Sequence, residues 1–213
     1  MPKIILMIFV VVSELASAQF FANPTVIARR TNLVTGGMLF SEVDYENGSR
    51  FDIERKLLAV DYAVPAGDDF DYIGMFGLSI DSELETEDGT GLLFGGGVRF
   101  LVHEEGPLRV TGYGGLVHVR DSMGDVDFSI FEFHGGGAFA YRATTKLTPY
   151  AAIGIVPFSD GEVEVGSASA DIERDDYLTI RLGASFYTRS YLLHSELTFG
   201  GEQNFQIGAS KTL

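Results

Sequence analysis

The stretch Leu178-Thr179-Ile180-Arg181-Leu182-Gly183-Ala184-Ser185-Phe186 alternates strictly between apolar residues and small or polar residues. Successive side chains of a β-strand point to opposite faces, so this stretch predicts a strand with one apolar and one polar face. Similar alternation recurs along the chain, and turn residues separate the alternating segments. We predict ten strands, near residues 33–45, 49–64, 69–84, 90–103, 108–120, 125–143, 148–163, 177–187, 191–200 and 203–213. The longest predicted loop covers residues 166–176.

The sixth segment changes phase part-way. Phe128 and Ile130 stand at even positions, whereas Phe131, Phe133 and Phe139 stand at odd ones. If all these apolar side chains share one face, a β-bulge next to a glycine is expected inside the segment.

Alternation of this kind is compatible with two architectures. A soluble sandwich or lipocalin-like barrel turns its apolar face inward, whereas a membrane barrel turns it outward to lipid. The polar face here consists mainly of Gly, Ser, Thr and isolated charges, which suits a narrow lumen filled by side chains. We therefore predict an all-β fold: a single antiparallel up-and-down transmembrane β-barrel with ten strands, eight being the alternative count. A soluble secreted ligand-binding β-barrel is the competing hypothesis.

The N-terminus predicts export. Lys3 precedes the apolar run 4–12, and the small residues Ala16-Ser17-Ala18 follow it, which is typical of a secretory signal peptide cleaved near Ala18/Gln19. The run is about half the roughly 20 residues that a spanning helix needs. We expect a signal peptide at 1–18, an N-terminal periplasmic segment at 19–32 and the barrel at 33–213. The chain has no Cys, so neither a disulfide framework nor a lipoprotein anchor is available.

Two asymmetries along the predicted strands support a membrane barrel. If the chain starts on the periplasmic side, six tyrosines fall beside turns on that side: Tyr62, Tyr72, Tyr141, Tyr150, Tyr187 and Tyr191. We interpret them as a periplasmic aromatic girdle, although tyrosine is also common at strand ends in general. Acidic residues gather toward the opposite rim, among them Asp44, Glu83, Asp171 and Glu173. This rim is either a solvated surface or a place where divalent cations bind.

The polar face also carries ionisable groups that a narrow lumen would bury: Asp61, Arg99, Glu132, His134, Arg181, His194 and Glu196. An unpaired buried charge is costly, so these groups have to form pairs. We expect a structural charge network with contacts such as Glu132 or Glu196 with Arg99 or Arg181. Such a network fills the lumen and leaves little or no conductance.

Candidate chemistry is sparse. His194 and Ser195 are sequence neighbours on a predicted strand, so they point to opposite faces and cannot act as a base and its nucleophile. Four His and no Cys give no spacing typical of zinc ligands. We predict no catalytic residue, no metal site, no cofactor and no enzymatic activity. A net charge of −15 argues against nucleic acid as a partner.

Residues 33–213 as a whole resemble the small bacterial outer-membrane β-barrel proteins, of OmpA/OmpX type and the porin-like group. The last segment, 203–213, resembles the terminal strand that the barrel assembly machinery recognises in those proteins. The resemblance implies a location in the bacterial outer membrane and contact with its lipid and lipopolysaccharide. We expect a structural or surface-interaction role with an acidic extracellular rim. The alternative is a porin-like channel for small, preferably cationic, solutes.

Overall fold

The structure is a computed structural model and describes residues 23–25, 28, 31–46, 50–84 and 87–213. The predicted signal peptide, the predicted cleavage point and most of the segment 19–32 lie outside these residues. In the part of the chain that is described, no helix is long and apolar enough to cross a membrane.

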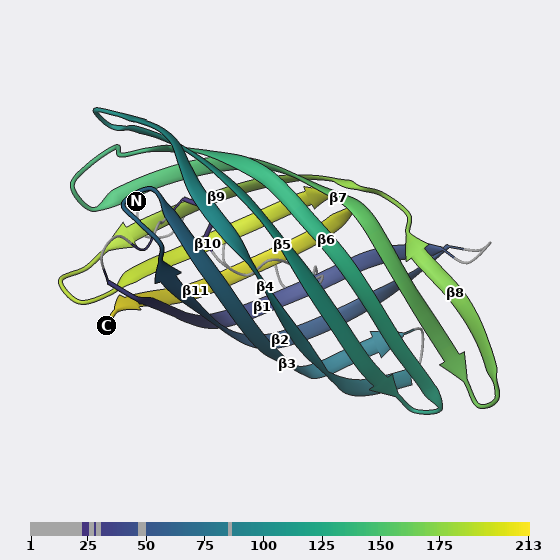
Figure 1. Cartoon of the computed structure of the whole chain (residues 1–213). Coiled ribbons are helices and arrows are strands. Elements are labelled where there is room, and N and C mark those ends of the chain that lie inside the picture. Colours follow the sequence, from purple (N-terminus) through teal and green to yellow (C-terminus); the bar gives the residue numbers. More distant parts are fainter. Residues whose placement is uncertain (1–22, 26–27, 29–30, 47–49, 85–86) are drawn as a thin grey trace, which may run out of the picture.

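The described residues form one antiparallel sheet that closes on itself (Figure 1). Its strands are β1 (Leu33–Glu46), β2 (Arg50–Pro65), β3 (Phe70–Leu84), β4 (Glu87–Glu105), β5 (Leu108–Met123), β6 (Val126–Tyr141), β7 (Leu147–Val165), β8 (Ala168–Arg174), β9 (Leu178–Tyr187), β10 (Leu192–Gly200) and β11 (Glu202–Thr212). Closure comes from pairing of β11 with β1, and β7 pairs with β9 as well as with β8. The predicted ten-stranded antiparallel barrel is confirmed, with β8 as an additional strand.

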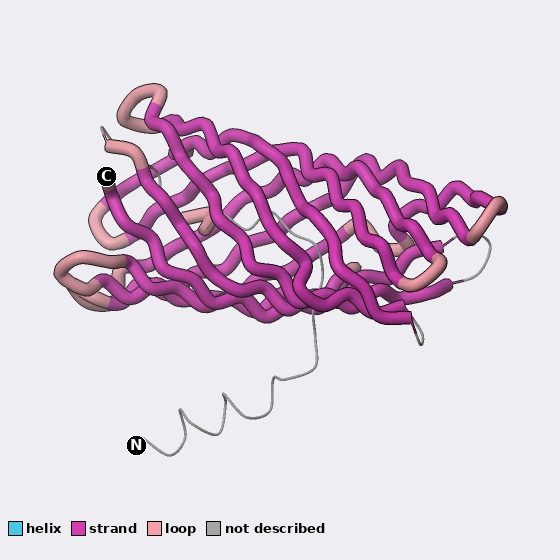
Figure 2. Tube along the Cα trace, turned by 90° about the horizontal axis from the view of Figure 1, so that it is seen from below, coloured by secondary structure: helices cyan, strands magenta, loops and turns pink. Residues whose placement is uncertain are grey.

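The two ends of the barrel differ. The turns after β2, β4, β6 and β9 lie at one end of the barrel. The C-terminus lies at the same end, which we call the C-terminal end (Figure 2). The turns after β1, β3, β5, β7 and β10 lie at the other, which we call the β8 end. Tight two-residue turns begin with Gly124 and Gly166, whose φ angles of 55° and 62° belong to the left-handed region that favours glycine.

Strand β8 corrects the prediction of a loop at residues 166–176. The chain turns back after β7, and β8 pairs with residues 161–165 of β7. Its last residues also pair with β1, Tyr45 with Arg174 and Glu46 with Glu173. Strands β9, β10 and β11 are shorter than their neighbours, so β8 completes the wall beyond them. The loop prediction was wrong because Ile172 is the only large apolar residue of β8, which leaves the alternation hard to see.

Apolar side chains face outward along most of the barrel. Phe76, Phe94 and Ile153 are 51%, 52% and 61% exposed, and residues next to them in sequence, such as Met75 and Leu93, are buried. The same alternation holds for Leu178, Ile180 and Leu182 on β9, which are exposed, and Thr179 and Arg181, which are buried. A continuous apolar band therefore surrounds the barrel, as expected of a surface that meets lipid.

At the β8 end this polarity reverses. Inward-facing side chains there are apolar and pack into one cluster that includes Val43, Tyr45, Ile53, Val119, Met123, Phe128, Ile130 and Ile172. Outward-facing side chains are mainly charged, among them Asp52, Glu54, Lys56, Glu83, Arg120, Glu162, Asp171 and Glu173. This end is thus built like a soluble β-barrel, with an apolar core and a wetted surface.

The reversal explains the phase change in the sixth predicted segment. Phe128 and Ile130 are buried in the apolar cluster, whereas Phe131 and Phe133 are exposed on the outside. Strand β6 keeps one regular alternation throughout, and only the environment of its two faces changes. The predicted bulge is therefore not in β6 itself, although the pairing of β6 with β7 does shift register between Phe133 and Gly135. This register shift places the extra residue in β7, around Pro157. Proline has no backbone N–H, and at a bulge that group is not needed for the hydrogen bonds between the strands.

Candidate functional site

The interior of the barrel is the candidate site, because it gathers the ionisable groups singled out from the sequence. All seven are buried, with exposed fractions of 0–5%: Asp61, Arg99, Glu132, His134, Arg181, His194 and Glu196. They come from β2, β4, β6, β9 and β10, and each is at an inward position of its strand.

Strands β9 and β10 bring two of these groups into direct contact. Nε of Arg181 donates to Oε1 of Glu196 at 2.6 Å. The guanidinium carbon of Arg181 lies 5.6 Å from the centre of the Tyr113 ring, a cation–π distance. On β10, His194 accepts a hydrogen bond at Nε2 from the side-chain amide of Gln206, at 3.1 Å. Arg181 and Glu196 thus pair with each other. Both carboxylate oxygens of Asp61, in contrast, are buried without a hydrogen-bond partner among the described residues, so the expectation that every buried charge is paired was wrong for Asp61.

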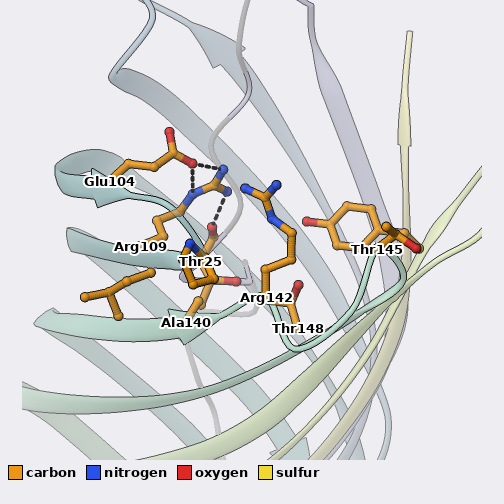
Figure 3. A pocket seen from close by; sticks show the side chains of 10 residues that line it. Thr25, Glu104, Arg109, Ala140, Arg142, Thr145 and Thr148 are labelled. Carbon is orange, nitrogen blue, oxygen red and sulfur yellow. Dashed lines mark hydrogen bonds and ion pairs between the residues drawn. The ribbon is translucent and has the colours of Figure 1, made fainter.

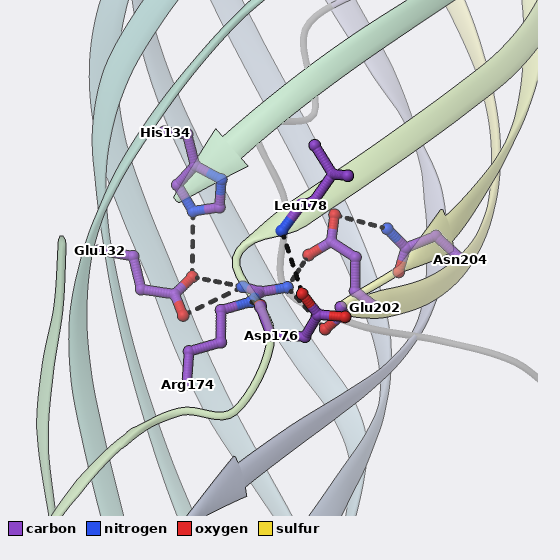
Figure 4. A network of polar contacts seen from close by, with 8 residues as sticks. Glu132, His134, Arg174, Asp176, Leu178, Glu202 and Asn204 are labelled. Atoms are coloured by element: carbon purple, nitrogen blue, oxygen red, sulfur yellow. Dashed lines mark hydrogen bonds and ion pairs between the residues drawn. The ribbon is translucent and has the colours of Figure 1, made fainter. Parts of the chain in front are cut away.

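A second cluster lies toward the β8 end and centres on Arg174 (Figure 4). Nη1 of Arg174 donates to both carboxylate oxygens of Glu132, at 3.1 and 3.0 Å, and Nη2 donates to Glu202 and to the backbone oxygen of Gly201. His134 contacts Glu132 at 3.0 Å. Arg174 therefore joins β8 to β6 and β11 across the interior. Neither Arg174 nor Glu202 was predicted from the sequence, because Arg174 fell in the predicted loop and Glu202 beside a predicted turn.

Another buried ion pair was also missed. Nε of Arg55 donates to Oδ2 of Asp121 at 2.7 Å, and both side chains have no exposed surface. Oγ of Ser82 donates to the other oxygen of Asp121, also at 2.7 Å. The guanidinium group lies over the Phe128 ring, at 4.8 Å from its centre. This pair attaches β2 to β5 next to the apolar cluster.

Residues 23–25 and 28 are buried inside the C-terminal mouth of the barrel. Arg99 binds both oxygens of Asp71, at 3.1 and 2.8 Å, and its Nη1 donates to the backbone oxygen of Asn23 at 2.6 Å. Asp71 also accepts from the backbone N–H of Ala28, at 2.7 Å. Arg99 and Asp71 thus pair with each other and hold the incoming chain.

Three further hydrogen bonds fix this segment. The Asn23 side chain donates to Ser185, Thr111 donates to the backbone oxygen of Pro24, and Arg109 donates to the backbone oxygen of Thr25, at 3.0, 2.6 and 3.1 Å. Asn23 and Thr25 have exposed fractions of 1% and 2%. We call residues 23–25 and 28 the N-terminal strap. It occupies part of the mouth that a solute would enter.

Two of the six tyrosines predicted for a girdle do not face outward. Tyr150 is only 6% exposed, because even-numbered residues of this part of β7 point inward, and its ring fills the space that Gly183 leaves on β9. Tyr187 is at an inward position at the end of β9 and lines a cavity in the mouth. For both tyrosines, the position in the alternating pattern predicts the direction of the side chain better than the distance from a turn does. The other four, Tyr62, Tyr72, Tyr141 and Tyr191, are exposed on the outside.

The outer acids near the β8 end affect one another. Burial raises the pKa of the Glu42 carboxyl above its ordinary 4.5, and the negative charges of Asp52, Glu54 and Asp44 raise it further. Glu42 is paired in register with Glu54 on β2, so two carboxylates lie side by side at the edge of the apolar band. Like charges at such positions destabilise a sheet.

Glu42→Gln is expected to increase the free energy of unfolding at pH 7, by on the order of 0.5 kcal/mol, because water screens this half-exposed site. A carboxyl whose pKa is higher in the folded than in the unfolded state is destabilising once it ionises. The gain is therefore expected at neutral pH and should vanish below about pH 4, where both states are protonated. Urea unfolding in detergent at both pH values measures this. An equal gain at both would contradict the assignment.

Among the described residues, no group of three or more His, Asp or Glu side chains is arranged to hold a metal ion. His134 lies against Glu132, which Arg174 already binds, so the three form a closed ionic cluster. The ion pairs of this cluster run between strands β6, β8 and β11.

Comparisons with known proteins agree with this architecture. No protein-family model and no curated protein matches the sequence. Among solved structures, the outer membrane protease OmpT from Escherichia coli superposes with a TM-score of 0.55 over 90% of this chain and 100% of that one. The chain has the fold of an outer-membrane β-barrel protein.

Two other solved structures are also similar to this chain. The translocator domain of the autotransporter NalP from Neisseria meningitidis gives a TM-score of 0.51, with 87% of this chain and 90% of that one covered. An outer membrane channel from Pseudomonas putida F1 gives 0.49, covering 90% and 98%. Sequence identities are 9% to OmpT, 8% to NalP and 10% to the channel. At such identities the likeness concerns the fold alone.

Proposed function

We propose that this protein is an integral protein of the bacterial outer membrane with a closed lumen and a structural or surface-interaction role. The observation that carries the proposal is that chain segments and side chains occupy the interior at three levels. The N-terminal strap occupies the C-terminal mouth, ion pairs occupy the middle, and an apolar cluster occupies the β8 end.

The two ends suggest an orientation. In single-chain bacterial barrels an even number of strands leaves both termini in the periplasm. We accordingly place the C-terminal end in the periplasm and the β8 end outside the cell. The acidic outer face of the β8 end would then be displayed at the cell surface, where it presents charge to a partner.

A closed lumen distinguishes this role from the porin-like alternative. Conduction needs a continuous water-filled path, but the side chains that would line it are buried and joined across the interior by Arg174 and Arg55. Removing one partner of a buried ion pair destabilises a folded protein by roughly 3–5 kcal/mol. Side chains held so firmly would not move aside for a passing solute.

Planar-bilayer recording tests the proposal. The folded barrel is expected to give no steady single-channel current. A variant without residues 23–28 is expected to remain ion-tight, because the apolar cluster and the Arg174 cluster still close the other end. Steady open currents from the unmodified barrel would contradict a closed lumen and favour the porin-like channel. Currents from the deletion variant alone would show that the strap, and not the interior clusters, is the barrier.

Three partners remain predictions. Outer-membrane lipid and lipopolysaccharide would contact the apolar band and the acidic rim, where divalent cations would offset the repulsion between anionic groups. The barrel assembly machinery would act on residues 203–213, most of which form β11, the strand that closes the barrel on β1.

A further inference from the structure

A cavity of about 270 Å³ opens in the C-terminal mouth beside the N-terminal strap. It lies between the β4–β5 turn, the β6–β7 turn and the end of β9 (Figure 3). Its polar lining comes from Thr25, Glu104, Arg109, Arg142, Thr145, Thr148 and Tyr187. The inner wall is formed by Ala140, which is buried on the interior face of β6. The cavity therefore belongs to the lumen side of the wall, away from the apolar band.

Arg109 is held rigidly at this cavity. Its Nε and Nη2 both donate to Oε1 of Glu104, and its Nη1 donates to the backbone oxygen of Thr25. The side chain is partly buried, so its guanidinium group is fixed before any ligand arrives. Such pre-organisation lowers the entropy cost of binding.

Arg142 provides a second guanidinium group, which points into the same space (Figure 3). Its backbone N–H donates to the oxygen of Pro107 at 2.8 Å, which fixes its position at the end of β6. Within the described residues, the Arg142 side chain makes no hydrogen bond or ion pair. Its donors are therefore available to a ligand.

The charge balance of the cavity is unusual for this protein. The whole chain has 15 basic and 30 acidic residues, whereas the lining has two arginines and one glutamate. The hydroxyl groups of Thr145, Thr148 and Tyr187 add further donors. Guanidinium forks together with hydroxyl donors match the oxygens of a phosphate group, which accepts several hydrogen bonds at once.

We propose that this cavity binds the phosphate group of a small polar molecule that enters from the C-terminal, periplasmic side. The volume exceeds what phosphate alone needs, so a phosphate ester with a polar body fits better than the free ion. A phospholipid headgroup offers the same phosphate chemistry. The lumen-side position of the cavity favours a soluble ester, since acyl chains would have to leave the apolar band.

The test uses the folded full-length barrel in dodecyl maltoside, with glucose 6-phosphate and inorganic phosphate as probes at constant ionic strength. Isothermal titration calorimetry is expected to show saturable binding, tighter for the ester than for the free ion. Arg142→Gln should weaken the binding at least tenfold. Arg189→Gln is the matched control, because Arg189 is also exposed at a turn of the same end but does not line the cavity.

Circular dichroism and heat-modifiable gel migration show whether each variant is folded. Loss of binding in Arg142→Gln alone supports the site. No binding to the unmodified barrel, or equal weakening by both substitutions, would overturn it. Parallel titrations in nanodiscs with and without phosphatidylglycerol separate the sources. If phosphatidylglycerol weakens the binding of millimolar glucose 6-phosphate, the site binds the phosphate of a lipid headgroup. If the lipid has no effect on that binding, the site binds a soluble ester.

Discussion

Arg174→Met is expected to destabilise the folded barrel by about 3–5 kcal/mol, because it leaves two buried carboxylates without their cation. Glu132 and Glu202 lie on strands β6 and β11 and have essentially no exposed side-chain surface. Methionine replaces the aliphatic part of the arginine side chain, but it is shorter and cannot compensate either charge. The free energy of unfolding, from urea titration in detergent micelles, measures the effect.

Two variants make the interpretation specific. Arg120→Met removes an exposed arginine from the outer face of β5, and its effect should stay within about 0.5 kcal/mol. Adding Glu132→Gln and Glu202→Gln to Arg174→Met should recover a large part of the loss, because no buried negative charge then remains. If Arg174→Met and Arg120→Met cost the same, the cluster does not stabilise the barrel.

Leu182→Arg is expected to destabilise the barrel in lipid vesicles by about 2–4 kcal/mol, the cost of a cation on the lipid face near the bilayer midplane. Leu182 is 49% exposed and lies on β9 with the apolar side chains of Ile180 and Phe186 on the same face. An exposed leucine on a wetted surface would tolerate the same substitution with little change.

Thr90→Arg is the matched control for that experiment. Thr90 is exposed on the outer face of β4 at the β8 end, where charged side chains dominate. Arginine there should change the free energy of unfolding by less than about 0.5 kcal/mol. Equal costs for the two variants would show that the band around Leu182 is not in contact with hydrocarbon.

Alternation in the sequence was sufficient to predict the ten-stranded antiparallel barrel, although not the additional strand β8. The seven ionisable groups at the inward positions are buried. A pattern with a period of two shows which side chains share a face of a strand. The pattern is still recognisable in this chain, which is only 9% identical in sequence to a solved barrel of the same fold. It does not report whether a face meets lipid, water or a core. Phe128 and Ile130 were misjudged for that reason, since an apolar side chain at the β8 end points inward.

The contacts of the interior were less predictable. Arg174 pairs with both Glu132 and Glu202, but its strand contains few apolar residues and has the composition of a loop. Ile172 and Arg174 are two residues apart, so on a strand their side chains share one face. This spacing was the signal in the sequence that could have placed Arg174 inside the barrel. The N-terminal strap binds mainly through its backbone oxygens and N–H groups, which no side-chain pattern reveals. Tyr150 and Tyr187 were placed by proximity to turns, and their parity would have placed them inside.

The orientation of the apolar side chains can be measured directly, because the chain has no native cysteine. Single cysteines at Phe76, Ile153 and Glu164, all exposed on the outside, can carry an environment-sensitive NBD label. In vesicles, doxyl-labelled lipids are expected to quench the label strongly at positions 76 and 153 and weakly at 164. Water-like emission without quenching at 76 and 153 would contradict a barrel that turns its apolar band toward lipid.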